Sequence, residues 1–185
     1  MPDGSVDVVT TRSVLIYVDD KAKAFAAFAR VLRPGGRVSL FEPINRLMYP
    51  EPPGRFCGYD LGAVTDLVAK VNSTFDDLED PAFRAAMMDF DDRDLTSLAE
   101  AADFERVHVE CHVDIEPGSL MRPVSFEALL DSAPNPNAPT VRDAIAAALD
   151  EAEHERFLGE LKRAFVRDAS VRRMAVAYLA ASKSR

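Results

Sequence analysis

The stretch that decides the fold is residues 3–45, which read DGSVDVVTTRSVLIYVDDKAKAFAAFARVLRPGGRVSLFEPIN. The run from Val6 to Thr10 is short, apolar and rich in β-branched residues, which is typical of a strand buried on both faces. Val38 to Phe41 forms a second run of this kind. A helix fits between the two runs, and strands joined through a helix lie parallel.

The intervening helix has a start signal, an apolar face and a stop signal. Asp19 or Asp20 can cap its amino end. Its apolar face recurs at helical spacing through Phe25, Phe28 and Leu32. Pro34-Gly35-Gly36 is expected to end it.

The residue identities in this strand–helix–strand unit are more informative than its hydrophobic pattern, because they indicate a protein family. Asp3-Gly4-Ser5-Val6-Asp7-Val8-Val9 and Arg30-Val31-Leu32-Arg33-Pro34-Gly35-Gly36 resemble strand four and the turn before strand five of class I S-adenosylmethionine-dependent methyltransferases of the type 11-like kind. The resemblance implies an α/β fold, a partial Rossmann-like sheet with helices on both faces.

Four strands are expected, over residues 6–11, 37–42, 105–115 and 173–182. In the family they correspond to strands four, five, six and seven. The resemblance therefore implies the order 4-5-7-6, with the last strand antiparallel.

The same resemblance shows which family features this sequence lacks. The family's glycine-rich cofactor loop and its ribose-binding carboxylate come before strand four, but five residues precede Val6, and no G-x-G-x-x-G occurs in the chain. A truncated gene, a misassigned start or a genuine short paralogue would each give this. The expected function is S-adenosylmethionine-dependent methyl transfer to a small molecule, inactive or impaired in this chain alone, with weak or absent cofactor binding. The alternatives are a split enzyme completed by a separate fragment, and a non-catalytic remnant or interaction module.

The composition of the chain limits the kinds of molecule that it is expected to bind. The chain has 185 residues and a net charge of −9, which argues against nucleic acid and anionic membranes because both need basic patches. Apolar runs fall short of the roughly 20 residues that cross a bilayer, and there is no signal-peptide pattern. We expect a cytoplasmic protein with a small-molecule acceptor.

Helices are also expected between the later strands. One runs through about residues 60–78, and another is capped by Asp91 or Asp92. The whole chain is interpreted as one partial methyltransferase domain, residues 1–185, with a helical insert at 116–170. In the family such inserts commonly form a lid over the substrate cleft, but two surface helices packed on the sheet explain the pattern equally well.

The cofactor side is predicted from the end of the first strand, because ligands of doubly wound sheets bind beyond the carboxyl ends of the strands. The resemblance places Arg12 near the cofactor, with Thr11 and Ser13 beside it. Arg12 could instead cap the strand or pair with a carboxylate. Asp7 is interpreted as a structural carboxylate.

Five residues are candidates for the acceptor side. Tyr17 lies in the loop before the first helix and could point toward an acceptor or simply pack. Glu42 ends the second strand and could act as a base if its pKa were raised, or hold the loop through backbone hydrogen bonds. Tyr49, Phe56 and Tyr59 cluster near a proline-rich loop that could wall an acceptor pocket. No catalytic residue is assigned, because methyl transfer needs mainly positioning.

No metal site is expected. His108, Glu110 and His112 alternate on one strand face, which is typical of a solvated edge strand more than of a ligand set. Cys57 and Cys111 are interpreted as lone thiols.

The strand at 6–11 is expected to present an open edge. In the family, strand one pairs there, and nothing in this chain takes its place. An apolar edge invites pairing with another chain, so self-association through residues 6–11 is predicted.

Overall fold

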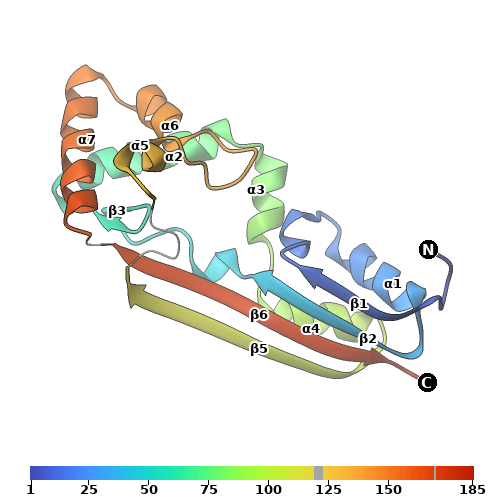
Figure 1. The fold of residues 1–185 in the computed structure, drawn as a ribbon. Helices are drawn as coiled ribbons and strands as arrows, with labels where there is room; N and C mark the ends of the chain where they lie inside the picture. Colours follow the sequence, from blue (N-terminus) through green and yellow to red (C-terminus); the bar gives the residue numbers. More distant parts are fainter. Residues whose placement is uncertain (119–122, 169) are drawn as a thin grey trace. The chain divides into compact units, whose positions relative to one another are not determined.

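The computed structural model describes residues 1–118, 123–168 and 170–185. These residues form two compact units (Figure 1). Unit 1 comprises Met1–Tyr49, Ala82–Val113 and Met174–Arg185, and unit 2 comprises Pro50–Pro81 and Asp114–Arg173. Each unit has a hydrophobic core of its own. Residues 119–122 and 169, which fall in the predicted insert, lie outside the described residues.

Unit 1 is built on a four-stranded sheet with the order β1-β2-β6-β5. β1 and β2 are parallel, and β2 and β6 are antiparallel. In Figure 1 the arrows of β5 and β6 also run in opposite directions. The mixed α/β class and the predicted order 4-5-7-6 are therefore confirmed. The strands span Val6–Arg12 (β1), Leu32–Pro43 (β2), Phe104–Pro117 (β5) and Val171–Lys183 (β6).

Helix α1 (Lys21–Val31) connects β1 to β2 and begins as the sequence predicts. The Asp20 side chain accepts a hydrogen bond from the Lys23 backbone nitrogen at 2.8 Å, which satisfies one of the free amides of the first turn. At the other end, Nζ of Lys183 donates to the carbonyl oxygens of Ala29 and Leu32 at 2.7 and 2.8 Å. A cation at this end also suits the helix dipole.

The start of β2 differs from the prediction. The helix ends at Val31, before the Pro-Gly-Gly turn, and the strand begins at Leu32 instead of residue 37. The partners of β1 change from Val6↔Leu32 to Val8↔Arg37, so residues 33–36 form an irregularity in the ladder. Gly35 permits it because its φ of +76° lies in the left-handed region.

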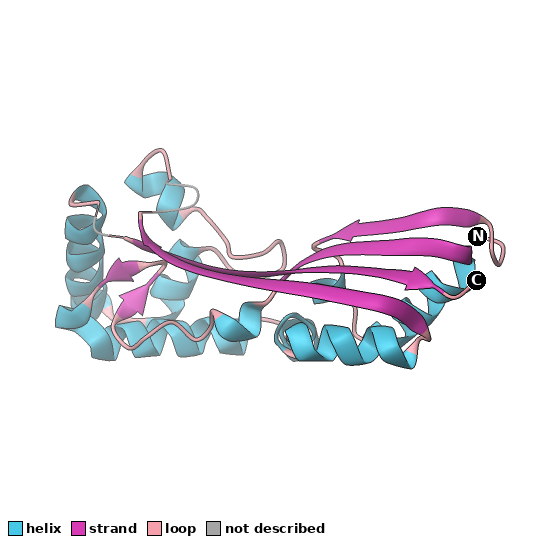
Figure 2. Ribbon diagram, turned by 90° about the horizontal axis from the view of Figure 1, so that it is seen from below, coloured by secondary structure: helices cyan, strands magenta, loops and turns pink. Residues whose placement is uncertain are grey.

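Helices cover one face of this sheet. α4 (Asp92–Ala101) is capped by Asp91 and Asp94 in a reciprocal capping box. Phe25 of α1 and Leu95 of α4 join sheet residues in the core of unit 1, and Figure 2 shows helices running along the same side of these strands. Side chains on the other face, among them Thr10, Ser39 and Tyr178, are largely exposed. The first strand is therefore not buried on both faces, and the expected helices on both faces are not found in the described part of unit 1, because its helices pack on one face only. The other elements are η1 (Leu15–Tyr17), η2 (Asn45–Leu47) and α3 (Pro81–Met88).

Unit 2 is mainly helical. The predicted helix at 60–78 becomes η3 (Gly62–Val64) and α2 (Thr65–Leu78). Its apolar face is fully buried and consists of Leu61, Val64, Leu67, Val68 and Val71. The helices of the predicted insert share one core with α2; whether they act as a lid remains a prediction. The further elements are β3 (Arg55–Phe56), β4 (Tyr59–Asp60), α5 (Phe126–Leu130), α6 (Val141–Ala148) and α7 (Glu151–Val166).

Candidate functional site

The carboxyl ends of β1 and β2 lie side by side, as the parallel pairing requires. Thr11 pairs with Leu40 and Arg12 with Phe41 in the ladder. The Thr11 hydroxyl donates a hydrogen bond to Oε1 of Glu42 at 3.2 Å. The structure thus brings together two sets of predicted site residues, one from the end of each strand.

Glu42 holds the loop that follows β1. Its side chain is fully buried. The backbone nitrogen of Val14 donates to Oε1 at 3.1 Å, and that of Leu15 donates to Oε2 at 3.0 Å. These are the contacts of the loop-holding role considered for Glu42 in the sequence. A contact with an acceptor remains a prediction.

The pKa of Glu42 is raised above its ordinary value, chiefly because burial disfavours the charged carboxylate. The hydrogen bonds from Val14, Leu15 and Thr11 lower it but do not offset the burial. The folded protein therefore holds a proton on Glu42 at pH values where the unfolded chain has lost it.

This shift predicts a pH-dependent stability difference between the wild type and a Glu42→Gln variant, which cannot titrate there. The advantage of the carboxyl group should be fully present below pH 4.5, the ordinary value, and should diminish as the pH rises through the raised pKa. Urea unfolding of both proteins between pH 4.5 and neutrality measures the difference. A difference that stays constant or grows with pH would contradict the shift.

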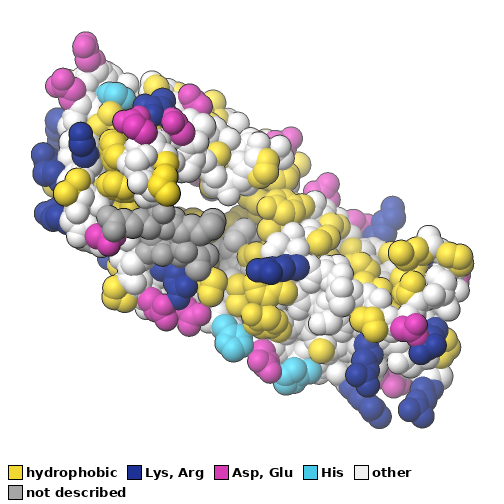
Figure 3. Space-filling model, viewed as in Figure 1, with side chains coloured by type: hydrophobic (Ala, Val, Ile, Leu, Met, Phe, Trp, Pro, Cys, Tyr) yellow, Lys and Arg dark blue, Asp and Glu magenta, His cyan; other side chains and the backbone are white. Residues whose placement is uncertain are grey.

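Arg12 begins a row of side chains across the exposed face of the sheet. Its guanidinium carbon lies 5.2 Å from the centre of the Phe41 ring. Tyr178 of β6 packs edge-on against Phe41 at 5.1 Å, and His112 of β5 against Tyr178 at 5.6 Å. Figure 3 looks onto this face, where histidine and acidic side chains border hydrophobic ones. The row gives unit 1 an exposed aromatic surface beside the end of β1.

Tyr17 lies in the loop that Glu42 holds. Its ring stacks on Phe83 of α3, with 5.6 Å between the ring centres and 21° between the planes. The Tyr17 side chain remains 47% exposed. Its packing is thus observed, and a contact with an acceptor remains a prediction.

Lys21 is a functional candidate that the sequence reasoning missed. It is only 6% exposed, although it carries a charge. Its Nζ donates to the carbonyl oxygens of Val18 and Ala86, both at 2.9 Å, and to Oδ1 of Asp89 at 2.5 Å. Lys21 thereby ties the loop after β1 to α3 and the residues that follow it.

The remaining predicted site residues lie in different places. Ser13 follows β1 with a φ of +54°, and its nitrogen donates to the Phe41 carbonyl at 2.8 Å. Tyr49 is exposed and belongs to unit 1. Phe56 and Tyr59 are buried in unit 2, against Phe157 and Phe165 respectively. Acceptor contacts by these aromatic residues remain predictions.

The alternating face of β5 is exposed, as predicted for a solvated strand. Nε2 of His108 and Nε2 of His112 lie 2.9 and 3.3 Å from the two carboxylate oxygens of Glu110. The hydrogen bonds to these histidines lower the pKa of Glu110 below its ordinary value, and the one to His108 has the larger effect. Over residues 1–118, 123–168 and 170–185, no cluster of His, Cys, Asp and Glu has a metal-binding arrangement. Cys57 and Cys111 are free thiols.

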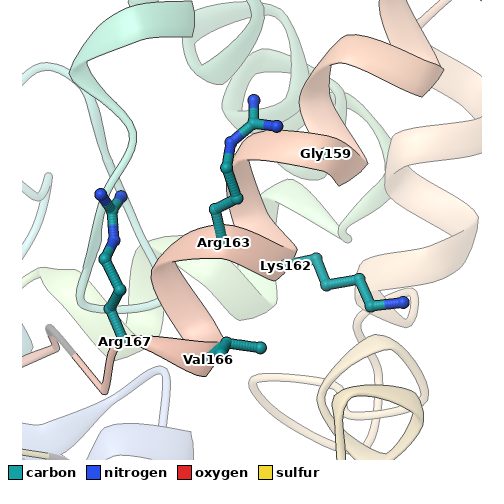
Figure 4. A pocket seen from close by; sticks show the side chains of 5 residues that line it. All are labelled: Gly159, Lys162, Arg163, Val166 and Arg167. Carbon is teal, nitrogen blue, oxygen red and sulfur yellow. The ribbon is translucent and has the colours of Figure 1, made fainter.

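A shallow hollow lies on α7, and none of the residues that line it was a predicted site residue (Figure 4). Arg163 and Arg167 point to one side of the helix, and Lys162 and Val166 to another. Arg163 pairs with Glu160 at 2.5 Å. Basic side chains near a helix carboxyl end suit the helix dipole, so this hollow needs no ligand to explain its charge.

Comparison with known proteins gives a family match for the first forty residues. A family model described as a methyltransferase domain matches residues 1–40. The resemblance inferred from the two motifs of this segment is thereby confirmed. A curated protein of Streptomyces fradiae, an uncharacterized 37.1 kDa protein in transposon TN4556, is 51% identical over 43 residues. The match covers 23% of this chain and 12% of that protein.

Two solved structures are similar to this chain over almost its whole length. Phosphoethanolamine N-methyltransferase 2 of Haemonchus contortus, in complex with phosphomonomethylethanolamine and S-adenosylhomocysteine, matches with a TM-score of 0.42 and 16% identity. The match covers 99% of this chain and 35% of that one. The YcgJ protein of Bacillus subtilis matches with a TM-score of 0.46 and 16% identity, covering 100% and 67%. This chain thus spans about a third of the first structure's length.

Among the residues that the structure describes, no helix is both long enough and apolar enough to cross a bilayer.

Proposed function

We propose that this chain carries the acceptor side and part of the cofactor side of an S-adenosylmethionine-dependent methyltransferase that acts on a small molecule. The observation that carries the proposal is the position of the segment recognised as a methyltransferase domain. Residues 1–40 contain β1, the loop held by Glu42 and most of β2, and so supply the edge where a doubly wound sheet binds its ligands.

The residues at the carboxyl end of β1 suit the end of the cofactor that carries a carboxylate. Arg12 is exposed and can bind a carboxylate, and Thr11 and Ser13 offer polar groups beside it. Bound S-adenosylmethionine supplies a methyl group on a sulfonium. No glycine-rich G-x-G-x-x-G loop occurs in the sequence, so we expect this chain alone to hold the cofactor weakly.

The contribution of the chain's own residues is positioning. Transfer of a methyl group needs the acceptor atom in line with the bond that breaks, and a fixed geometry supplies much of the rate. Glu42 and Lys21 hold the two ends of the loop that presents Tyr17. Tyr17 then orients the acceptor, with Tyr49 of the same unit as a further candidate; Phe56 and Tyr59 belong to the core of unit 2. The net charge of −9 favours a neutral or cationic acceptor.

Nuclear magnetic resonance titration with S-adenosylmethionine tests this proposal. We expect a dissociation constant of about 1 mM or weaker, with shifts concentrated on the backbone amides of residues 10–17. Arg12→Ala should abolish the shifts. Arg37→Ala is the matched control, because Arg37 is exposed in the middle of β2, where it pairs with Val8 and not with the end of β1.

Two results would count against this assignment. Binding in the micromolar range would contradict the weak site and require a substitute for the glycine-rich loop. The absence of any shift at residues 10–17 at millimolar cofactor would favour the alternative, a non-catalytic interaction module.

A further inference from the structure

The short helical turn η1 is capped by a side chain from a neighbouring strand. Val14 precedes η1 and offers no side-chain cap of its own, and the first amides of a helix have no partner within it. Glu42 of β2 supplies the missing acceptors. The Val14 nitrogen donates to its Oε1 at 3.1 Å, and the Leu15 nitrogen donates to its Oε2 at 3.0 Å. Glu42 therefore fixes the start of the turn that carries Tyr17.

The two carboxyl oxygens of Glu42 differ in a further contact. Oε1 also accepts a hydrogen bond from the Thr11 hydroxyl, at 3.2 Å. A backbone N–H can only donate, whereas a hydroxyl can donate or accept. Among the groups that bond to Glu42 here, Thr11 is therefore the one able to accept a hydrogen bond from a protonated carboxyl, and it lies at Oε1.

We propose that Glu42 and Thr11 form a proton-dependent latch on the start of η1, in which protonation of Glu42 releases the Val14 amide and leaves the Leu15 amide held. The proton binds to Oε1, and the new O–H donates to Oγ1 of Thr11. Thr11 is half-buried, so its own hydrogen can turn to water. Oε1 then accepts poorly from Val14, while Oε2 still accepts from Leu15. On ionisation the proton returns to water, and the Thr11 hydroxyl again donates to Oε1.

The surroundings of Glu42 favour this change in mild acid. Its side chain is fully buried, and burial raises its pKa above the ordinary value. The ladder sets the apolar Ala177 of β6 opposite it. Arg12 stands over an aromatic ring on the exposed face of the sheet, and Lys21 is paired with Asp89. Within the described part of the chain, no charged side chain is among the main causes of the shift. The latch therefore responds to the proton on Glu42 itself.

The latch joins the two sides of the candidate site. Thr11 belongs to the predicted cofactor side, and η1 carries Tyr17 of the acceptor side. In acid, release of Val14 should loosen η1 and with it the stack of Tyr17 on Phe83. A looser acceptor position would slow methyl transfer, and this consequence rests on the proposed function. The latch itself does not, because it involves only atoms of this chain.

Nuclear magnetic resonance of the full chain, without cofactor, between pH 4.5 and neutrality tests the latch. The shift of the Glu42 carboxyl carbon gives the midpoint of its titration. Hydrogen exchange, corrected for its intrinsic dependence on pH, gives the protection of the Val14 and Leu15 amides. Below the midpoint Val14 should lose about 10-fold in protection, and Leu15 less than about 2-fold. Since no cofactor is present, the result is independent of whether the chain takes part in methyl transfer.

Two variants distinguish the latch from a general loosening of the loop. Glu42→Gln carries one donor and one acceptor, as the protonated carboxyl does, so Val14 should show the low protection of the acid form at every pH. Thr11→Val removes the accepting hydroxyl, and Val14 and Leu15 should then change alike. Thr11→Ser, the matched control, should keep the difference between them.

Three results would overturn the proposal. The first is an equal loss of protection at Val14 and Leu15 in the wild type. The second is a Val14 amide whose protection stays constant while Glu42 titrates. The third is full wild-type protection of Val14 in Glu42→Gln.

Discussion

Replacement of Phe157 by alanine is expected to remove about 4 kcal/mol of the free energy that keeps unit 2 folded. Phe157 lies on α7 and has no exposed surface. Its ring packs edge-on against Phe56 of β3 at 5.3 Å. Alanine would remove this contact and leave a cavity where α2, α6 and α7 meet, and a packed core collapses only partly around such a cavity.

Native-state hydrogen exchange measures this loss unit by unit. Since the two cores share no residue, amides of α2, α6 and α7 should lose protection while those of β2 and β6 in unit 1 keep theirs. Val166→Ala is the matched control, because Val166 lies on the same helix but is 72% exposed; it should change stability by less than about 0.5 kcal/mol. Equal loss of protection in both units would show that they unfold as one.

Replacement of Lys21 by methionine is expected to cost about 3 kcal/mol in unit 1. Methionine fills a similar volume but cannot donate. The carbonyl oxygens of Val18 and Ala86 would lose a charged donor, and Asp89 would lose its ion-pair partner. The Asp89 side chain is 44% exposed and can regain water, so we place the cost below that of a fully buried pair.

The substitution of Lys21 should also loosen the loop that forms part of the candidate site. Without the Lys21 contacts, the loop at residues 13–20 loses its tie to α3, and the Tyr17–Phe83 stack should loosen. Urea unfolding gives the stability, and exchange of the amides in residues 13–20 gives the mobility. Lys23→Met is the matched control two residues along α1, where the side chain is exposed. Similar losses in the two variants would rule out a specific role for Lys21.

Two buried ionisable side chains of opposite charge therefore hold one loop. Glu42 accepts hydrogen bonds from Val14 and Leu15 at its start. Lys21 donates to Val18 near its end. A buried polar side chain needs hydrogen bonds that replace the lost water. The loop supplies some of these to both side chains, and Ala86 and Asp89 supply the others to Lys21. The arrangement gives a rigid edge beyond β1 and β2, which suits a reaction that depends on positioning.

The sequence by itself determined the architecture of unit 1. Apolar runs separated by a capped helix predict parallel strands, since a strand–helix–strand connection has few solutions. The resemblance carried by residues 3–9 and 30–36 added the strand order and the direction of the last strand. The strand–helix–strand unit depends on local sequence, and the strand order is common to the members of the fold. Both can therefore be predicted from a single sequence.

Only the tertiary structure decided which side chains meet. The sequence assigned Leu32 to the helix and started the next strand at residue 37, but the pairing of Val6 with Leu32 begins it earlier. Lys21 stands four residues before Phe25, on the apolar face of the helix, and that spacing was its one available signal. Its burial depends on Ala86 and Asp89, which lie 65 and 68 residues away in the chain. A charged residue is stable inside a protein only where distant groups supply its hydrogen bonds, and no local pattern shows where those groups will be.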